Sequence, residues 1–238
     1  MKRLVASHGQ HFLRDSRLIA ELVGHSDIRK RDVVIDLGAG SGAITEVLAR
    51  RAAQVIAVES EPGVYKKLQS NMQPHGNVTV VRADIMTFVE PDTAYKIFAN
   101  IPFSLSSKVV RKYCSGDYPP SSMYLIVQKQ FAQKIVTQGD HFHAALGMMI
   151  APWWEARIRR PLRKTDFTPP PAVDTVLLEL KPRELPLLPR EQMQTYMKFV
   201  ERCYAEPRYY MQHGGTVDKK PSTLSKEAWV ALYSVSCH

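Results

Sequence analysis

Short runs of β-branched and aliphatic residues alternate along this chain with segments of helical pattern, and this alternation constrains the fold more than any other feature. Buried strands are predicted at 33–35, 55–58, 78–81, 97–98 and 124–127. Helices are predicted between them, near 42–51, 61–71, 104–114 and 128–137. Strands and helices that alternate at this spacing predict a doubly wound, Rossmann-like α/β sheet.

The pattern changes after Leu180, where the buried runs stop and prolines become frequent. Three of these prolines mark a linker, namely Pro182, Pro186 and Pro189. Helical patterns return near 190–205 and 225–234. We therefore expect a catalytic α/β domain at residues 1–180, followed by a small helical C-terminal domain at residues 181–238.

The net charge of the chain indicates what kind of partner it binds. The 238-residue chain has 32 Lys and Arg against 23 Asp and Glu, a formal net charge of +9, which favours an anionic partner such as nucleic acid. Its cysteines, Cys114, Cys203 and Cys237, lack the spacing of metal ligands or of a disulfide framework. No run is long and apolar enough for a signal peptide or a membrane span. We expect a soluble, cytoplasmic, monomeric protein without a metal.

Candidate ligand-binding residues follow the first three predicted strands. Residues 36–42, Asp-Leu-Gly-Ala-Gly-Ser-Gly, come directly after the first strand, and Gly38 is among the glycines that allow a ligand to approach the backbone. Glu59 ends the second strand, where its carboxylate can accept from both hydroxyls of a ribose. Asp84 ends the third strand and can accept from an adenine amino group, while Ile85 packs on the ring. Together these strand ends predict an adenosine pocket.

The glycine loop by itself leaves a second interpretation open. Gly38, Gly40 and Ala43 also satisfy the dinucleotide fingerprint, and Glu59 lies 21 residues after Gly38, as that fingerprint requires. A nicotinamide-dependent dehydrogenase therefore shares this part of the pattern. The residues after the fourth strand are what separate the two hypotheses.

The fourth strand is followed by Asn100, Ile101, Pro102 and Phe103. The Asn100 side-chain oxygen and a neighbouring backbone carbonyl can accept both hydrogens of an exocyclic base amine. Pro102 helps to keep its own and the preceding carbonyl free, and Phe103 can stack on the base, a contact worth roughly 1–3 kcal/mol. Such a group has no role in hydride transfer. In isolation, the same four residues are also typical of a strand that ends in a proline turn above a buried Phe.

In this order, the motifs resemble those of the rRNA adenine N6-methyltransferases, and the chain resembles most the Erm macrolide-resistance methylases. The resemblance covers roughly the first three quarters of the chain. It begins at residues 9–13, Gly-Gln-His-Phe-Leu, and ends at residues 167–173, Phe-Thr-Pro-Pro-Pro-Ala-Val. It implies S-adenosylmethionine (SAM) as the methyl donor and a Rossmann-like catalytic domain followed by a small helical domain.

The resemblance also implies a role for individual residues. His11 and Leu13 are expected to line the cofactor from the N-terminal segment, and Gly38 to approach its methionine part. Glu59 is expected to hold the ribose, and Asp84 with Ile85 the adenine. Asn100 then lies near both the donor methyl and the target amine.

Two positions distinguish branches of this family. Phe103 stands where the related small-subunit dimethylases usually have Tyr, and Ile101 where they commonly have Leu. A Phe keeps the stacking face and lacks the hydroxyl, so Ile101 and Phe103 favour the antibiotic-resistance branch. His11 departs from the Erm pattern, which often has Asn there, but both residues can hydrogen-bond, so this is a mild variation.

Two basic clusters are candidate RNA-binding surfaces. Residues 147–159 and 173–180 are expected to form an antiparallel hairpin at the edge of the sheet, and the first cluster lies on it: Arg157, Arg159, Arg160, Arg163 and Lys164. The second cluster follows the Asn100 motif at helical spacing: Lys108, Arg111 and Lys112. Runs of charge are usually solvated surfaces, but these flank the predicted pocket, so we expect phosphate contacts.

The leading hypothesis is SAM-dependent mono- or dimethylation of N6 of a specific adenine in 23S rRNA, with naked or pre-assembly 23S rRNA as the expected partner. Such a modification gives resistance to macrolide, lincosamide and streptogramin B antibiotics. A second hypothesis is housekeeping dimethylation of small-subunit rRNA. A third is a non-catalytic RNA-binding relative that keeps the fold. An adenine buried in an RNA stack must be flipped or captured from a loop, at a cost of a few kcal/mol.

Overall fold

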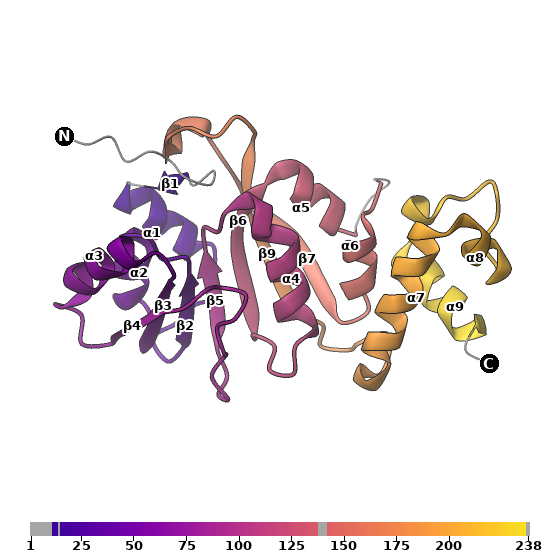
Figure 1. Cartoon of the computed structure of the whole chain (residues 1–238), viewed down its shortest axis with the longest axis horizontal. Helices are drawn as coiled ribbons and strands as arrows, with labels where there is room; N and C mark the ends of the chain where they lie inside the picture. Colours follow the sequence, from indigo (N-terminus) through magenta and orange to yellow (C-terminus); the bar gives the residue numbers. More distant parts are fainter. Residues whose placement is uncertain (1–10, 14, 138–141, 237–238) are drawn as a thin grey trace.

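The computed structural model describes residues 11–13, 15–137 and 142–236. Its centre is a seven-stranded sheet in the order β4-β3-β2-β5-β6-β9-β7 (Figure 1). The strands are β2 (Val33–Leu37), β3 (Gln54–Glu59), β4 (Val78–Arg82), β5 (Lys96–Ala99), β6 (Ser122–Gln128), β7 (Trp154–Leu162) and β9 (Thr175–Pro182). Each of the five strands predicted from buried runs is present.

The direction of the strands confirms the α/β fold class. The five strands from β4 to β6 are parallel, and β9 is antiparallel both to β6 and to β7. The chain moves outward from β2 through β3 to β4, then returns to the other side of β2 to form β5. This reversal creates a topological switch point at the carboxyl ends of β2 and β5, where open α/β sheets bind their ligands.

Helices cover both faces of the sheet. The helices that precede, connect or follow the parallel strands are α1 (Ser16–Gly24), α2 (Ala43–Ala49), α3 (Pro62–Met72), α4 (Ser106–Ser115) and α5 (Lys129–Ile135), with a 3₁₀ turn, η1 (Phe103–Leu105), ahead of α4. Helices α1 and α2 pack on one face, against alternate strand residues such as Val34 and Phe98. Helices α4 and α5 pack on the other, against Ile35 and Ile97. The period of two along each strand produces these two cores.

Residues 147–150 of the predicted hairpin segment 147–159 are helical and residues 151–153 form a turn, which corrects the sequence prediction. Helix α6 (Ala145–Ile150) precedes β7, and the hairpin partners are β7 and β9. A side chain at Gly147 would lie 2.8 Å from the carbonyl oxygen of Lys134 in α5. Glycine therefore lets α6 approach the α5 backbone, and Met148 and Met149 are buried there. A short apolar run cannot by itself distinguish a buried helix from a strand.

The C-terminal helices gather at one end of the elongated molecule (Figure 1). They are η3 (Arg190–Gln192), α7 (Met193–Ala205), α8 (Pro207–Gln212), η4 (Pro221–Thr223) and α9 (Lys226–Ser236). Apolar packing continues from α6 into α7, because Tyr196 packs edge-on against Trp153 and donates to the carbonyl of Met148. Trp153 and Trp154 are both buried in this core. The domain boundary at 180/181 stays a prediction.

Candidate active site

The carboxyl ends of four neighbouring parallel strands bring the predicted ligand-binding residues to one edge of the sheet. Gly38 follows β2, Glu59 ends β3, Asp84 follows β4 and Asn100 follows β5. Because the four strands are parallel and adjacent, these positions share an edge although the sequence separates them widely. The edge includes the switch point between β2 and β5.

The glycine loop after β2 is held in left-handed backbone conformations. Gly38, Gly40 and Gly42 have φ angles of 69°, 58° and 97°. The amides of Gly38 and Ala39 donate to the carbonyl of Val58 at 2.9 and 3.0 Å. A side chain in these conformations is strained, and a Cβ at these positions would meet Ile85, Phe12 or Met72, so the loop takes this shape only with glycine.

Glu59 is a buried carboxylate that binds backbone amides. It is 6% exposed, and its Oε2 accepts from the amide of Gly40 at 3.0 Å. Its Oε1 accepts from the amides of Ser60 and Glu61, each at 2.9 Å. Both acceptor directions of Oε1 are thus used and Oε2 keeps one, so the carboxylate can still receive a hydroxyl donor while it shapes the loop. Its role toward a ribose stays a prediction.

Asp84 is exposed at the end of β4 and its Oδ1 accepts from the amide of Met86 at 2.7 Å. The next residue, Ile85, is buried, and its Cδ1 lies 3.4 Å from the position that a Cβ of Gly38 would occupy. The loop after β4 therefore contacts the glycine loop after β2. This contact places an apolar side chain and a carboxylate on one wall, as an adenine site requires.

Asp36 opens the glycine-loop motif, but the sequence predicted no role of its own for it. It is 1% exposed, its Oδ2 accepts from the hydroxyl of Thr45 at 2.7 Å, and its Oδ1 is buried without a described partner. Burial raises its pKa to about 7, because the Thr45 hydrogen bond offsets only part of the desolvation and the charge of Glu59 adds to it. The available signal was a lone acid inside the apolar run 33–37.

Asn100 is oriented by a backbone carbonyl. Its Nδ2 donates to the carbonyl oxygen of His11 at 2.7 Å. A carbonyl only accepts, so this contact fixes the amide group with its Oδ1 as the acceptor left for another donor. Ile101 is buried. The carbonyl of Pro102 accepts from the amide of Leu105 at 2.9 Å, which corrects the expectation that this carbonyl is free.

A two-stranded sheet, not predicted from the sequence, lies against the glycine loop. It pairs β1 (Phe12–Leu13) antiparallel with β8 (Phe167–Thr168), next to the 3₁₀ turn η2 (Lys164–Asp166). Phe12 reaches the glycine loop, since its ring lies 3.4 Å from the position of a Cβ on Gly40. The pairing brings together the first and last motifs of the family resemblance, at residues 9–13 and 167–173. Gly9 and Gln10 lie outside the described residues.

The three cations of the α4 cluster differ in their availability. Lys108 is exposed, and Arg111 pairs with Glu201 of α7 at 2.7 Å. The Lys112 ammonium donates to the carbonyls of Phe88 and Ile85 at 2.6 and 3.2 Å and pairs with Glu90 at 3.0 Å. Lys112 is therefore committed to the loop after β4 and is the least available of the three for a phosphate.

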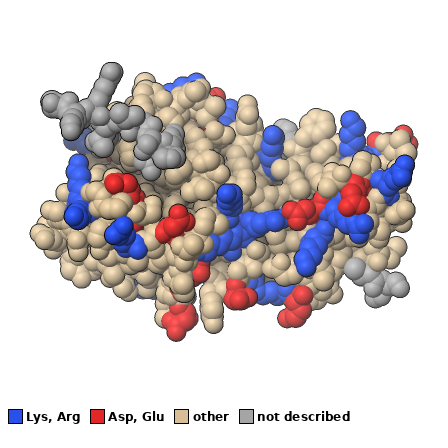
Figure 2. Space-filling model, in the orientation of Figure 1, with Lys and Arg blue, Asp and Glu red and all other residues tan. Residues whose placement is uncertain are grey.

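The cations on and after β7 each have an acidic neighbour. The pairs are Arg157 with Glu155, Arg159 with Glu179, Arg160 with Glu21, Arg163 with Asp166 and Lys164 with Asp174. The Arg163 side chain is 84% exposed, so its pair is weak in water. Figure 2 shows cations and carboxylates interleaved on the face that it presents. The RNA-binding roles of both clusters stay predictions.

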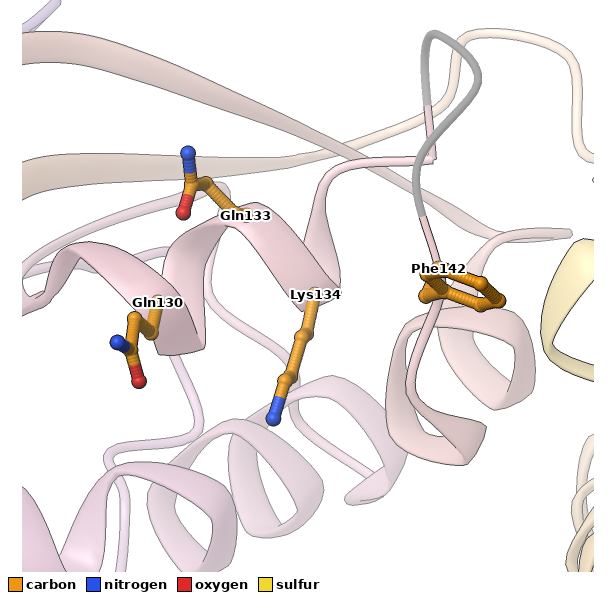
Figure 3. A pocket seen from close by; sticks show the side chains of 4 residues that line it. All are labelled: Gln130, Gln133, Lys134 and Phe142. Carbon is orange, nitrogen blue, oxygen red and sulfur yellow. The ribbon is translucent and has the colours of Figure 1, made fainter.

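Two hollows lie apart from the glycine loop. One, of about 220 Å³, is lined by Gln130, Gln133 and Lys134 of α5 with Phe142, which follows the helix in the chain (Figure 3). The other, of about 690 Å³, contains Arg157 and Arg159 and is lined by charged residues from β7 and β9. Neither is formed by the strand-end residues described above.

Thiol and metal chemistry find no support among the described residues. Burial raises the pKa of the Cys114 thiol well above its usual range, and it raises that of Cys203 to about 11. Cys237 lies outside the described residues. Within the described ranges, no group of three His, Cys, Asp or Glu is placed to hold a metal. No helix there is long and apolar enough to cross a membrane.

Comparison with known proteins agrees with this geometry. A family model described as ribosomal RNA adenine dimethylase matches residues 1–216. The chain is 29% identical over 207 residues to the mitochondrial ribosomal RNA small subunit methyltransferase of Arabidopsis thaliana, covering 85% of this chain and 54% of that protein. It is also 29% identical over 213 residues to ribosomal RNA small subunit methyltransferase A of Listeria monocytogenes, covering 85% and 72%. The chain thus spans about half of the plant relative.

Among solved structures, the 23S rRNA methyltransferase ErmE matches with a TM-score of 0.80 at 24% sequence identity. The match covers 95% of this chain and 100% of that one. A likeness at this identity concerns the fold, including the helices that follow the sheet.

Proposed function

This chain belongs to the ribosomal RNA adenine dimethylase family, and from that membership we propose that it transfers methyl groups from SAM to the N6 amine of an adenine in ribosomal RNA. The observation that carries the proposal is the orientation of Asn100. Its Nδ2 is held by the carbonyl of His11, which presents Oδ1 as a hydrogen-bond acceptor beside the switch point.

The strand-end residues fit SAM. The glycine loop presents bare backbone, and the three acids Asp36, Glu59 and Asp84 have no Lys or Arg partner among the described residues. Asp36 also has a buried oxygen without a described partner, an acceptor that a donor group of a ligand would complete. SAM, when bound, supplies an electrophilic methyl group on a sulfonium centre. Its positive charge suits a site with this excess of carboxylate.

The residues after β5 suit an aromatic amine. An adenine amine is a poor nucleophile, because its lone pair is delocalised into the ring. Asn100 Oδ1 accepts one amine hydrogen, which holds the nitrogen in place and favours localisation of the pair. Phe103 holds the base by stacking. The methyl group would pass directly to the amine as its bond to the sulfonium sulfur breaks, and the amine proton would pass to water, so the scheme requires no covalent enzyme intermediate.

We propose 23S rRNA as the substrate, and mono- or dimethylation that gives resistance to macrolide, lincosamide and streptogramin B antibiotics. Ile101 and Phe103, which resemble the resistance branch, support this choice. The matched curated relatives support the second candidate, dimethylation of small-subunit rRNA, because they are small-subunit methyltransferases by name. We further propose that the enzyme is a cytoplasmic monomer whose residues 181–238 form a small helical C-terminal domain.

The test uses purified protein and radiolabelled SAM with three substrates: naked 23S rRNA, naked small-subunit rRNA and assembled small subunits. Mass mapping of the product identifies the base and counts the methyl groups. Methylation of naked 23S rRNA at one adenine is the expected result. Incorporation confined to the small-subunit substrates would move the assignment to the second candidate, and no incorporation with any of the three would contradict the proposed activity.

A further inference from the structure

His11 connects three parts of the site that lie far apart in the sequence. Its backbone carbonyl accepts from Asn100, its Nδ1 lies 2.7 Å from the carbonyl oxygen of Pro169, and its ring stacks on Phe103. The two ring centroids are 5.5 Å apart and the ring planes differ by 29°. Aromatic pairs at this separation attract each other.

The contact with Pro169 requires a hydrogen on Nδ1 of the imidazole. A carbonyl oxygen only accepts, so Nδ1 carries the hydrogen in this contact. This hydrogen bond also fixes the rotation of the ring about its side-chain bonds. The imidazole therefore meets Phe103 in one orientation rather than as a mobile surface group.

Phe103 depends on His11 for its aromatic contact. It begins the 3₁₀ turn η1, is only partly buried, and has no other aromatic ring against it in the described part of the chain. The Pro169 segment, in contrast, has additional support, because β8 pairs with β1 through Phe12 and Leu13. Loss of the imidazole should therefore loosen the position of Phe103 more than that of Pro169.

We propose that the imidazole of His11 is a positioning group for methyl transfer, which holds one face of Phe103 so that the target base stacks on the other. The proposal rests on the proposed function, since it assigns a role within the same site. It assigns His11 a task beyond lining the cofactor. Stacking, rather than the Nδ1 hydrogen bond, is the part of the contact that supports the reaction.

Three substitutions separate the ring from the hydrogen bond. His11→Phe keeps an aromatic face and loses the donor to Pro169, His11→Asn keeps a donor and loses the ring, and His11→Ala loses both. His75→Ala, after α3 and outside the site, is the matched control. The rates are measured with the rRNA that the wild-type enzyme methylates, and kcat is separated from KM for SAM and for RNA.

We expect His11→Ala and His11→Asn to lower kcat by roughly 2- to 10-fold, the range of an aromatic pair, while KM for SAM changes by less than about twofold. His11→Phe should restore kcat to within about twofold of the wild type. A purely structural role predicts no such rescue by the aromatic variant. Equal rates in all three variants would overturn the proposal, and so would a faster His11→Ala enzyme, because the imidazole would then be obstructing the base.

A second measurement does not depend on activity. A double-mutant cycle of His11→Ala and Phe103→Ala in urea unfolding should show a coupling of about 2- to 10-fold in the unfolding equilibrium constant. Additive effects would contradict the stacking contact even if no rRNA is methylated. Absence of wild-type activity together with measurable coupling would instead count against the proposed function alone.

Discussion

The two edges of the parallel sheet have the same kinds of side chain and use them differently. At the amino edge, carboxylates meet cations. Asp27 pairs with Lys96 at 3.1 Å and with Lys181 at 2.9 Å, while Glu179 accepts from the hydroxyl of Tyr124 and pairs with Lys181 at 3.3 Å. Of these residues, Asp27, Tyr124, Glu179 and Lys181 line the hollow of about 690 Å³. Their charges are compensated within the protein.

At the carboxyl edge, the acids bind neutral donors. Glu59 accepts from three backbone amides, Asp84 from one, and Asp36 from the hydroxyl of Thr45. Such bonds orient a carboxylate and leave its charge uncompensated. The hollow at the amino edge is large and rich in charges, but the carboxylates described there already have cationic partners within the protein. The carboxylates of the candidate site at the carboxyl edge have no such partners among the described residues, and this difference makes the carboxyl edge the better candidate for a cationic ligand.

The largest effect is expected at Asn100. Asn100→Ala removes the acceptor for the base amine, so methyl transfer should fall by about 100- to 1,000-fold, as for loss of one oriented polar group at a reacting centre. Affinity for SAM should stay within about twofold. Steady-state methyl incorporation and calorimetry with SAM measure the two quantities.

Lys181→Ala, at the amino edge, serves as the control and should leave kcat unchanged at a temperature where the variant is folded. If Asn100→Ala remains active, the assignment of the β5 end as the amine-binding corner fails. If Lys181→Ala loses activity as strongly, the functional distinction between the two edges fails instead.

Asp36 tests whether uncompensated charge costs stability. Its pKa is raised to about 7, so between about pH 4 and pH 7 the folded protein binds more protons than the unfolded chain, and stability falls as the pH rises through this window. Asp36→Asn keeps an acceptor for Thr45 without the charge. Above pH 7 it should be more stable than the wild type by a few kcal/mol, and at pH 4 the difference should vanish.

Urea unfolding at several pH values measures this difference, and SAM affinity is measured in parallel. A variant that gains stability and loses affinity would show that the buried charge is kept for the ligand. Equal stability at all pH values would contradict the raised pKa. Unchanged affinity would remove Asp36 from the site.

Substitution of Lys112 tests whether the loop after β4 forms part of the SAM site. Its ammonium satisfies the carbonyls of Ile85 and Phe88, so Lys112→Met should loosen the loop and weaken SAM binding by about tenfold. RNA affinity should stay within about twofold, because this ammonium is already engaged. Lys108→Met, on the exposed side of the same helix, is the matched control.

We expect Lys112→Met to weaken the affinity for SAM and Lys108→Met to weaken the affinity for RNA. Filter binding with labelled rRNA and calorimetry with SAM separate the two. A Lys112→Met variant with normal SAM affinity and weakened RNA binding would contradict this role and support the phosphate contact that the sequence predicts for Lys112.

The strand ends could be predicted from the sequence because buried parallel strands have a strong local pattern and their carboxyl ends necessarily meet. Gly38, Glu59 and Asn100 were found in this way. The partners of Lys112 could not be found, since they depend on the path of the loop at 83–90. The β1 to β8 pairing was missed as well, because strands of two residues carry no periodicity.

The smallest effect is expected at the amino edge. Burial alone would raise the pKa of Asp27, but hydrogen bonds from Lys181, Ser122 and Lys96 lower it to about 2. A depressed folded pKa contributes stability above the unfolded value of 3.8, and this contribution is lost as the pH falls toward 2.

Asp27→Asn should therefore destabilise the protein by about 1 kcal/mol at pH 7, a value reduced from the full shift because the group is partly exposed. The destabilisation should disappear near pH 2, and methyl transfer at pH 7 should be unchanged. Urea unfolding at pH 7 and pH 2 gives the first two quantities. Loss of activity in a folded Asp27→Asn enzyme would break the division between a stabilising edge and a reactive edge, since compensated charge would then be acting on the chemistry.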